Sequence, residues 1–466
     1  MNEPDIASKI RKFLPPTPTS DQNNLLTLLC DFILHSKSGE CVIINGYAGT
    51  GKTTMISALV RSLSEVGIKS VMVAPTGRAA KVMSYYSELR AFTIHKKIYK
   101  QKSALVDAFV LDRNQESFTY FIVDEASMIS DSSFDSIFGS GNLLADLVDY
   151  VNSGKGCRLI IVGDKAQLSP VGRSESPALD MSVMERYCSK VTYGELCEVV
   201  RQSEGSAILK NATTIRRLIE RDNIKFPRFD CSKQDFISIS GADIFEHLET
   251  AYSKYGKDET IIITRSNKQA GRLNAAIRAR VLFMEEELSS GDMIMVVKNN
   301  YHYAQADNDI DFIANGDVAK VKRLRKYEEL YGKRFVTATL KFPDYNDLEM
   351  ECKVMLDTLM LDTPALPAEQ NRELFFKIEE DYADITVKKE RYQKIKEDSY
   401  FNALQIKFAY AVTCHKAQGG QWDCVFIDRM IFGDEELSID MLRWLYTAVT
   451  RAKKQIILVN FDERFL

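Results

Sequence analysis

The stretch GYAGTGKTT, residues 46–54, constrains the fold of this chain more than any other sequence feature. It follows the short apolar run CVIIN (41–45) and precedes Met55, Leu59, Val60 and Leu63, which recur at helical spacing. A glycine-rich turn between a buried strand and a helix is the context that a P-loop requires. The stretch therefore predicts a parallel α/β sheet with a phosphate-binding loop at the carboxyl end of a strand.

The residue types in this loop suit a nucleoside triphosphate. Gly46, Gly49 and Gly51 allow backbone N–H groups to point at phosphate oxygens, and the following helix N-terminus adds favourable partial charge. Lys52 is expected to reach the β- and γ-phosphates, and Thr53 to offer its hydroxyl to Mg²⁺. The candidate nucleotide contacts are completed by Thr50 and Thr54. The alternative is a glycine-rich loop that binds nothing.

Composition describes an ordinary globular chain. With 466 residues, 45% of them hydrophobic and 27% charged, it is long enough for about three to four domains. The nine scattered cysteines form no C-x-x-C pair, which suits a reducing compartment and gives no support to a zinc or iron–sulfur site. No signal-peptide pattern or membrane-length apolar run is present, so we expect a cytoplasmic location and no membrane partner. The net charge of −4 means that nucleic-acid binding would depend on a local groove.

Further strand-like runs each end in a polar or glycine-bearing turn, as in a parallel sheet covered on both faces. These runs are VMVAP (71–75), FTYFIVDE (118–125), RLIIVGD (158–164), TIIIT (260–264), CVFID (424–428) and QIILV (455–459). At the end of one run, Asp124 is expected to hold Mg²⁺ and Glu125 to orient or deprotonate the attacking water. An acidic turn is the alternative. At the end of the next, Gln167 is a candidate γ-phosphate contact, and a solvated glutamine is its alternative.

Eight motifs occur in the order of the superfamily-one helicase motifs and most resemble the B-type branch, which includes RecD, the PIF family and the phage Dda helicases. They are GYAGTGKTT, APTGRAAKVM (74–83), FTIH (92–95), VDEASM (123–128), GDKAQLSPVG (163–172), EVVRQ (198–202), TCHKAQGGQWD (413–423) and LYTAVTRAKK (445–454). The resemblance covers roughly residues 20 to 460 and implies an α/β fold with two RecA-like P-loop parallel-sheet domains.

The resemblance also implies domain limits and further site residues. The first motor domain is expected at 1–195, and the second at 196–284 and 400–466. Because no second P-loop follows residue 200, a single ATP site is implied. Arg201 and Arg451 match the family's two arginines that act on the γ-phosphate, where a guanidinium stabilises transition-state charge. Gln22 matches the glutamine that reads adenine, in a looser surrounding pattern.

Single-stranded DNA contacts are implied by the same resemblance. The matching positions are Pro75, Thr76, Thr93, His95, Thr413 and His415. Hydroxyl, backbone N–H and ring N–H groups suit phosphate and sugar contacts with little base reading. A lone histidine is more often structural, which is the alternative for His95 and His415. APTGRAA and VVRQ match the B-type branch and so imply movement from 5′ to 3′. RNA remains an alternative track.

Two insertions are expected in the motor domains. Residues 95–119 lie where family members place a strand-separating pin, with Leu105 and Phe109 as candidates for stacking on the terminal base pair. The alternative is that both pack on their own domain. Residues 285–363 alternate apolar and polar positions between glycine-bearing turns, which predicts a small β-barrel. A charged helical arm at 364–399 resembles the tower of Dda-like enzymes, and a solvated helix packed on the barrel is its alternative.

Taken together, the resemblance implies an ATP- and Mg²⁺-dependent DNA helicase and 5′–3′ translocase acting on single-stranded and tailed or forked duplex DNA. We expect a monomer with roles in DNA repair, recombination or replication and with partner proteins from those processes. Two alternatives are a P-loop NTPase that works as a switch without unwinding, and a motor subunit of a nuclease complex.

Overall fold

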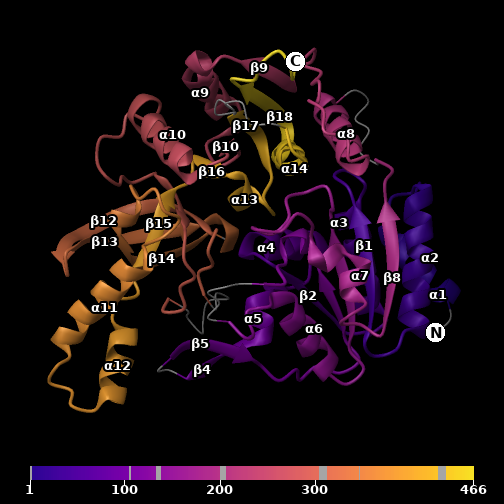
Figure 1. The fold of residues 1–466 in the computed structure, drawn as a ribbon, viewed down its shortest axis with the longest axis horizontal. Helices are drawn as coiled ribbons and strands as arrows, with labels where there is room; N and C mark the ends of the chain where they lie inside the picture. Colours follow the sequence, from indigo (N-terminus) through magenta and orange to yellow (C-terminus); the bar gives the residue numbers. More distant parts are fainter. Residues whose placement is uncertain are drawn as a thin grey trace. The chain divides into compact units, whose positions relative to one another are not determined.

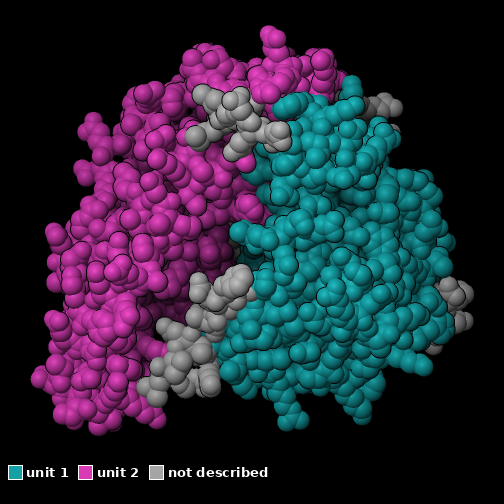
Figure 2. Space-filling model, in the orientation of Figure 1, with its two compact units in different colours: residues 1–102, 107–227, 436–450 teal, residues 103–106, 228–435, 451–466 magenta. Residues whose placement is uncertain are grey.

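The chain divides into two units in a computed structural model that describes residues 3–103, 106–132, 138–199, 206–303, 312–345, 347–428 and 437–466 (Figure 1). Unit 1 comprises residues 1–102, 107–227 and 436–450, and unit 2 comprises residues 103–106, 228–435 and 451–466, as coloured in Figure 2. Two parallel sheets and a closed barrel within these units confirm the predicted fold class.

Unit 1 contains a six-stranded parallel sheet in the described residues. Its order is β3 (Ala91–Thr93), β2 (Ser70–Ala74), β6 (Tyr120–Val123), β7 (Arg158–Gly163), β1 (Glu40–Gly46) and β8 (Lys190–Leu196). The apolar runs at 41, 71, 118 and 158 all form strands of this sheet. The edge strand β8 was not predicted from the sequence. Only two of its residues are buried, so it does not need the continuous apolar run that marks a central strand of a parallel sheet.

Strand β1 shows how the sheet acquires two cores. Val42 and Ile44 contribute to one hydrophobic cluster, and Cys41 and Ile43 to the other, as the two-residue period of a strand requires. The first face is covered by α1 (Glu3–Phe13), α2 (Ser20–His35), α3 (Lys52–Glu65) and α4 (Gly77–Ser87). The second is covered by α5 (Ile94–Ile98), α6 (Leu143–Ser153) and α7 (Met181–Met184). The P-loop thus follows a strand that is buried between two cores.

The remaining elements of unit 1 include two helices that are distant in sequence. Helix α8 (Ala207–Glu220) packs against α14 (Ile439–Val449), so the first unit extends to Pro227 and takes in Glu436–Thr450. The units therefore divide the chain differently from the expected limits at 195 and 400. Strands β4 (Tyr99–Ser103) and β5 (Val106–Leu111) pair within the expected pin insertion. Short 3₁₀ turns are η1 (Ala126–Met128) and η2 (Pro177–Leu179).

Unit 2 contains a five-stranded parallel sheet in its described part. The order is β16 (Ala411–Thr413), β10 (Thr260–Thr264), β17 (Trp422–Asp428), β18 (Ala452–Val459) and β9 (Phe236–Ile239). Its helices are η3 (Gly241–Asp243), α9 (Ile244–Tyr255), α10 (Asn267–Arg280) and α13 (Cys414–Ala417). The three predicted apolar runs at 260, 424 and 455 form its three inner strands.

A closed barrel is inserted into unit 2. It consists of β11 (Met293–Val296), β12 (Val318–Leu330), β13 (Lys333–Phe342), β14 (Leu348–Met355) and β15 (Leu404–Phe408), with η4 (Pro343–Tyr345) and η5 (Leu356–Thr358). The arm helices α11 (Ala368–Asp381) and α12 (Lys388–Glu397) are inserted before β15, so the barrel ends later than expected. Leu374, Ile378 and Ile395 pack in one cluster with Phe335 of β13, which is the predicted alternative for the arm. None of the helices in the described ranges is long and apolar enough to cross a membrane.

Candidate functional site

Left-handed backbone conformations shape the loop between β1 and α3. Gly49 and Gly51 have φ angles of 79° and 86°, which favour glycine because a Cβ would be strained there. The hydroxyl and N–H of Thr50 both bond to the carbonyl of Tyr47, at 2.8 and 3.3 Å. Thr50, a predicted nucleotide contact, therefore holds the turn closed with its side chain. Thr53 is half-buried and Thr54 exposed in the first turn of α3.

Lys52 lies inside the loop that it closes. Its ammonium donates to the carbonyls of Gly46 and, at 3.1 Å, Tyr47, and it lies 3.7 Å from the Asp164 carboxylate. A Cβ at Gly46 would stand 2.5 Å from Lys52 Cγ. A side chain at position 46 would therefore clash with the Lys52 side chain in its observed position. The ammonium is thus positioned on the loop's own carbonyls, which phosphate oxygens can replace as acceptors.

Asp124 and Glu125 directly follow β6. The Asp124 carboxylate accepts a 2.8 Å hydrogen bond from the Glu125 N–H. Burial, and then the charge of Glu125, raise the pKa of Asp124 to about 6, while the charge of Lys52 opposes the shift. Glu125 has a φ of 52°, a conformation that non-glycine residues adopt rarely and often at functional sites. Two carboxylates with different environments suit the two predicted roles.

Helix α14 contributes a contact to the P-loop that the sequence did not indicate. The hydroxyl of Tyr446 accepts from the Ala48 N–H at 2.8 Å and donates to the Asp164 carboxylate at 2.9 Å. On the same helix face, the Thr447 hydroxyl accepts from the Leu168 N–H at 2.9 Å, and Arg443 donates to the Ser174 carbonyl. The only sequence signal was that Tyr446 lies within the motif LYTAVTRAKK, five residues before Arg451.

The two predicted glutamines are both buried in unit 1. Gln22 lies at the third position of α2, where its side-chain oxygen accepts from the Thr19 N–H and its amide donates to the Thr50 carbonyl at 3.2 Å. Gln22 therefore ties α2 to the P-loop. The side-chain oxygen of Gln167 is buried with no hydrogen-bond partner among the described residues, which is uncommon and often marks a ligand position. The Gln167 oxygen is therefore an open acceptor on the same loop as Asp164.

Of the two predicted arginines, the structure describes only Arg451. Arg201 lies outside the described residues. Arg451 belongs to unit 2, where its side chain is buried and donates to the Gly420 carbonyl at 3.3 Å. Its own carbonyl accepts from the Trp422 N–H at 2.9 Å. Arg451 is therefore anchored to the start of β17.

The predicted DNA contacts form a repeated element. The tetrapeptide T-x-H-K occurs at 93–96 and again at 413–416. In each unit the threonine ends an edge strand, β3 or β16, and is the N-cap of the short helix that follows, α5 or α13. The neighbouring strands, β2 and β10, also end at hydroxyl N-caps, Thr76 and Ser266, which accept from Ala79 and Gln269 N–H groups. Sequence reasoning missed Ser266, although the repeat could have identified it.

The two histidines differ in exposure. His95 packs edge-on against Phe138, with ring centroids 4.9 Å apart, and burial lowers its pKa to about 4. It is therefore neutral near pH 7 and can act as a ring N–H donor without charge. His415 is exposed at the end of its sheet, and Pro75 is half-buried at the end of β2.

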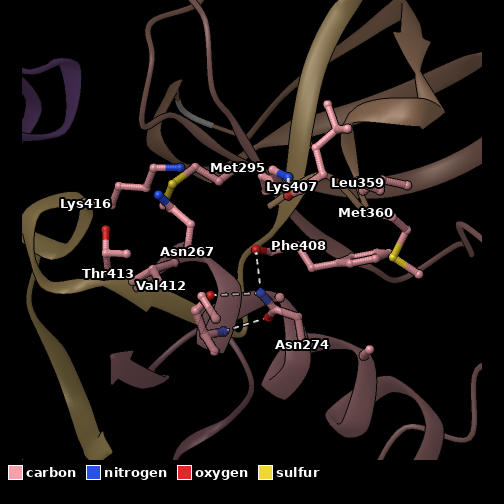
Figure 3. Close-up of a pocket in the computed structure, with 15 residues that line it drawn as sticks. Asn267, Asn274, Met295, Leu359, Met360, Lys407, Phe408, Val412, Thr413 and Lys416 are labelled. Atoms are coloured by element: carbon pink, nitrogen blue, oxygen red, sulfur yellow. Dashed lines mark hydrogen bonds between the residues drawn. The ribbon is translucent and has the colours of Figure 1, made fainter. Parts of the chain in front are cut away.

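A pocket in unit 2 adjoins the second T-x-H-K element (Figure 3). Thr413 and Lys416 line it together with Asn267 of α10 and Lys407 of the barrel strand β15. Asn274 fixes the connection between the barrel and the sheet, because its amide donates to the Phe408 and Ala411 carbonyls at 3.1 and 2.9 Å. Two lysines, a hydroxyl and an amide are groups that suit a phosphate.

The predicted pin residues receive different outcomes. Leu105 lies outside the described residues. Phe109 lies in β5 and stacks on Phe138, with centroids 4.6 Å apart and an interplanar angle of 23°. Phe138 also contacts His95 and Tyr99, and both phenylalanines pack against a core cluster of unit 1. This packing favours the alternative in which Phe109 stabilises its own domain, and a role in strand separation stays a prediction.

The residues present fit a magnesium-bound nucleotide. The Thr53 hydroxyl and the Asp124 carboxylate are oxygen donors of the kind that Mg²⁺ accepts, directly or through water. The glycine conformations of the loop and the Lys52 ammonium fit the phosphates.

Comparisons with known proteins agree with this geometry. A family described as AAA domain matches residues 31–226, and one described as UvrD-like helicase C-terminal domain matches residues 408–459. The ATP-dependent DNA helicase dda of enterobacteria phage T4 is 26% identical over 292 residues, covering 60% of this chain and 60% of the phage protein. The ATP-dependent RecD2 DNA helicase of Deinococcus radiodurans is 28% identical over 130 residues, covering 28% of this chain and 16% of that protein.

A solved structure shares the fold. A Pif1 helicase structure, described as the basis for DNA unwinding at forked double-stranded DNA by two coordinating Pif1 helicases, has a TM-score of 0.50 at 15% identity. The alignment covers 96% of this chain and 93% of that one. The matches to the two curated relatives each span less than two thirds of the relative's length.

Proposed function

We propose, from the premise that this chain belongs to the superfamily 1B helicases, that it hydrolyses ATP to move 5′ to 3′ along single-stranded DNA and to open duplexes. The observation that carries the proposal is the T-x-H-K element, which ends an edge strand in both sheets although the sequence has one P-loop. A switch NTPase needs one nucleotide site and has no use for a duplicated contact element. A translocase needs two places to hold one strand.

Residues of both units would divide the hydrolysis reaction among them. Lys52 and the loop N–H groups would hold the phosphates, and Glu125 would orient or deprotonate the attacking water. Thr53 and Asp124 would hold Mg²⁺, which neutralises charge that develops on the phosphate oxygens. The Gln167 side-chain oxygen, which has no hydrogen-bond partner among the described residues, would be an acceptor for a water molecule. Arg201 and Arg451 are proposed to stabilise the γ-phosphoryl group in the transition state.

The strand would be held through its backbone. Thr76, Thr93 and His95 in unit 1 have their counterparts in Ser266, Thr413 and His415 in unit 2. Hydroxyl and neutral ring N–H donors contact phosphate and sugar with little base reading. Such contacts predict binding that tolerates many sequences, as a translocase requires. We further propose that the protein works as a monomer and that partners in DNA repair or recombination direct it to its substrates.

The test measures duplex opening and ATP hydrolysis in the same tubes, with a 5′ or a 3′ single-stranded tail. We expect opening from the 5′ tail alone. Opening from the 3′ tail alone would keep a helicase and reject the direction. Hydrolysis stimulated by a tail without opening would reject duplex opening and leave translocation, and no stimulation would favour the switch. An RNA tail in a parallel series tests the track.

Lys52→Ala is the control for the nucleotide site. It removes the ammonium from the P-loop, so hydrolysis is expected to fall by about 10²- to 10³-fold, the order expected when one charge-stabilising donor is lost. Single-strand binding without nucleotide should persist, because the proposed strand contacts lie at other strand ends. Normal turnover in this variant would contradict the site assignment.

A further inference from the structure

We infer that Tyr446 is a positioning residue for ATP, which holds Asp164 away from Lys52 so that the ammonium is available to phosphate. The inference rests on the proposed nucleotide function of unit 1. It starts from the one polar side chain of α14 that contacts both the P-loop and the loop after β7 in the described residues. Tyr446 and Asp164 are 1% and 0% exposed. Bulk water therefore cannot replace the hydrogen bonds of the phenol and the carboxylate.

The hydroxyl of Tyr446 makes both of the hydrogen bonds that its position allows. It accepts from the Ala48 N–H at 2.8 Å, and it donates to the Asp164 carboxylate at 2.9 Å. The same carboxylate accepts from the Ala166 N–H at 3.0 Å. Burial and the charge of Asp164 raise the pKa of Tyr446 well above its usual value, so its proton stays in place.

Lys52 is the cation nearest to this carboxylate in the described structure, at 3.7 Å. That distance is longer than a direct ionic hydrogen bond, because the ammonium donates to the loop carbonyls instead. Without the Tyr446 hydroxyl, the Oδ2 atom of this buried carboxylate would lose its donor, while Oδ1 keeps the Ala166 N–H, and Lys52 would be the available replacement at Oδ2. A closer Lys52–Asp164 pair would then compete with ATP for the ammonium.

The rest of α14 makes this contact rigid. Thr447 and Arg443 hold the segment from Leu168 to Ser174 at neighbouring turns of the helix. The helix therefore fixes the position of the hydroxyl relative to Asp164, as a support for a binding site requires.

Unit 2 provides a matched control in Tyr410. Its hydroxyl also accepts from a backbone N–H, that of Met293 at 3.0 Å, and donates to a buried carboxylate, Asp292 at 2.9 Å. Asp292 also has a cation partner, Arg278 at 3.0 Å. Tyr410 is as buried as Tyr446. Tyr410→Phe thus removes the same chemical group from the same kind of environment, in the unit that does not contain the P-loop.

The experiment compares Tyr446→Phe and Tyr410→Phe in the full chain. Circular dichroism should show a similar fall in Tm for both. For Tyr446→Phe alone, the Kd for a fluorescent ATP analogue and the KM for ATP should each rise by roughly tenfold, the factor expected for one hydrogen bond to a charged group. The kcat should change less. An equal effect of the two variants on Kd would overturn the inference.

A second substitution tests the mechanism. Asp164→Asn added to Tyr446→Phe removes the charge that would attract Lys52, so the Kd should return to within about threefold of the wild-type value. No recovery would overturn the inference. If Tyr446→Phe does not fold, the Asp164→Asn variant alone tests the inference. The asparagine keeps an acceptor for the Tyr446 hydroxyl but removes the charge that would attract Lys52. A tenfold weaker binding of the ATP analogue by this variant would contradict the proposed competition.

The readouts separate this inference from the proposed function. Binding of the analogue by the wild-type chain without strand-stimulated hydrolysis would reject the motor and leave the Tyr446 inference to be decided by the Kd values. Strand-stimulated hydrolysis with equal Kd shifts in both tyrosine variants would keep the motor and reject the inference. Failure of the wild-type chain to bind nucleotide would reject both.

Discussion

Asp124 links the chemistry of single residues to stability. Burial and the neighbouring Glu125 raise its pKa from 3.8 to about 6. The folded state therefore binds this proton more tightly than the unfolded state. The stability that this gives is present at low pH and is lost as the pH rises through about 6, because an ionised carboxylate is then held in a poorly solvated site. Above pH 6 the ionised Asp124 carboxylate lowers the stability of the folded state, and binding of a cation can offset this loss.

Asp124→Asn should therefore stabilise the nucleotide-free protein while it abolishes Mg²⁺-dependent hydrolysis. We expect a gain on the order of 1 kcal/mol at pH 8, which shrinks as the pH falls from 6 towards 4. Thermal unfolding at pH 8 and pH 4.5 measures it. In the wild type, the Mg²⁺ concentration needed for half-maximal hydrolysis should rise below pH 6, since protonated Asp124 cannot bind the ion. Equal Tm differences at both pH values would show that the charge is not the cause.

At the scale of elements, the β4–β5 hairpin shows how packing limits a functional assignment. Its position between α5 and β6 agrees with the expected pin insertion. Phe109 lies on one of its strands, but stacks on Phe138 within the core contacts of unit 1. This packing favours the alternative in which Phe109 stabilises its own domain, and its role in strand separation stays a prediction.

Phe109→Ala should accordingly lower stability. We expect a loss of about 1 to 3 kcal/mol, because a half-buried aromatic ring and its stacking partner are separated. Denaturant unfolding measures the loss. Leu105→Ala is the comparison within the same insertion, and if Leu105 separates strands it should reduce duplex opening without changing strand-stimulated hydrolysis. If Phe109→Ala leaves stability unchanged but reduces duplex opening, the result would instead support a role for Phe109 in strand separation.

At the scale of the whole molecule, charge is the relevant property. The chain has a net charge of −4, so attraction to DNA has to come from local groups. The pocket of unit 2 supplies Lys416 and Lys407 beside Thr413 (Figure 3). Burial lowers the pKa of Lys407 to about 8 and also lowers that of Lys416. The Lys407 ammonium already donates to the Leu361 carbonyl, and a phosphate in the pocket would add a negatively charged partner.

Lys416→Gln should weaken single-strand binding and reduce its salt dependence. The slope of log K against log salt should fall by about 1, as for the loss of one phosphate contact. Fluorescence anisotropy at several salt concentrations measures the slope. Lys257→Gln, which changes an exposed lysine after α9, should leave the slope unchanged. Equal slopes for both variants and the wild type would exclude Lys416 from the strand path.

Local sequence predicted the parts of this protein whose determinants are contiguous. Residues 41–63 contain a buried strand, a glycine turn and a helix in succession, and each needs only its own neighbours to form. The same holds for Asp124, which directly follows an apolar strand run. The residues of the T-x-H-K elements were implied only by the family resemblance. The eight ordered motifs indicated the resemblance to the superfamily-one helicases without any knowledge of contacts.

Only the tertiary structure decided how distant segments complete the site. Helix α14 joins unit 1 although about two hundred residues separate it from α8, and its Tyr446 bonds to a loop 398 positions earlier. The edge strand β8, the partner of Phe109 and the barrel strand β15 likewise depend on surfaces formed elsewhere in the chain. A residue's period and neighbours determine which face it presents, whereas its partner is selected by burial and hydrogen bonding in the assembled core.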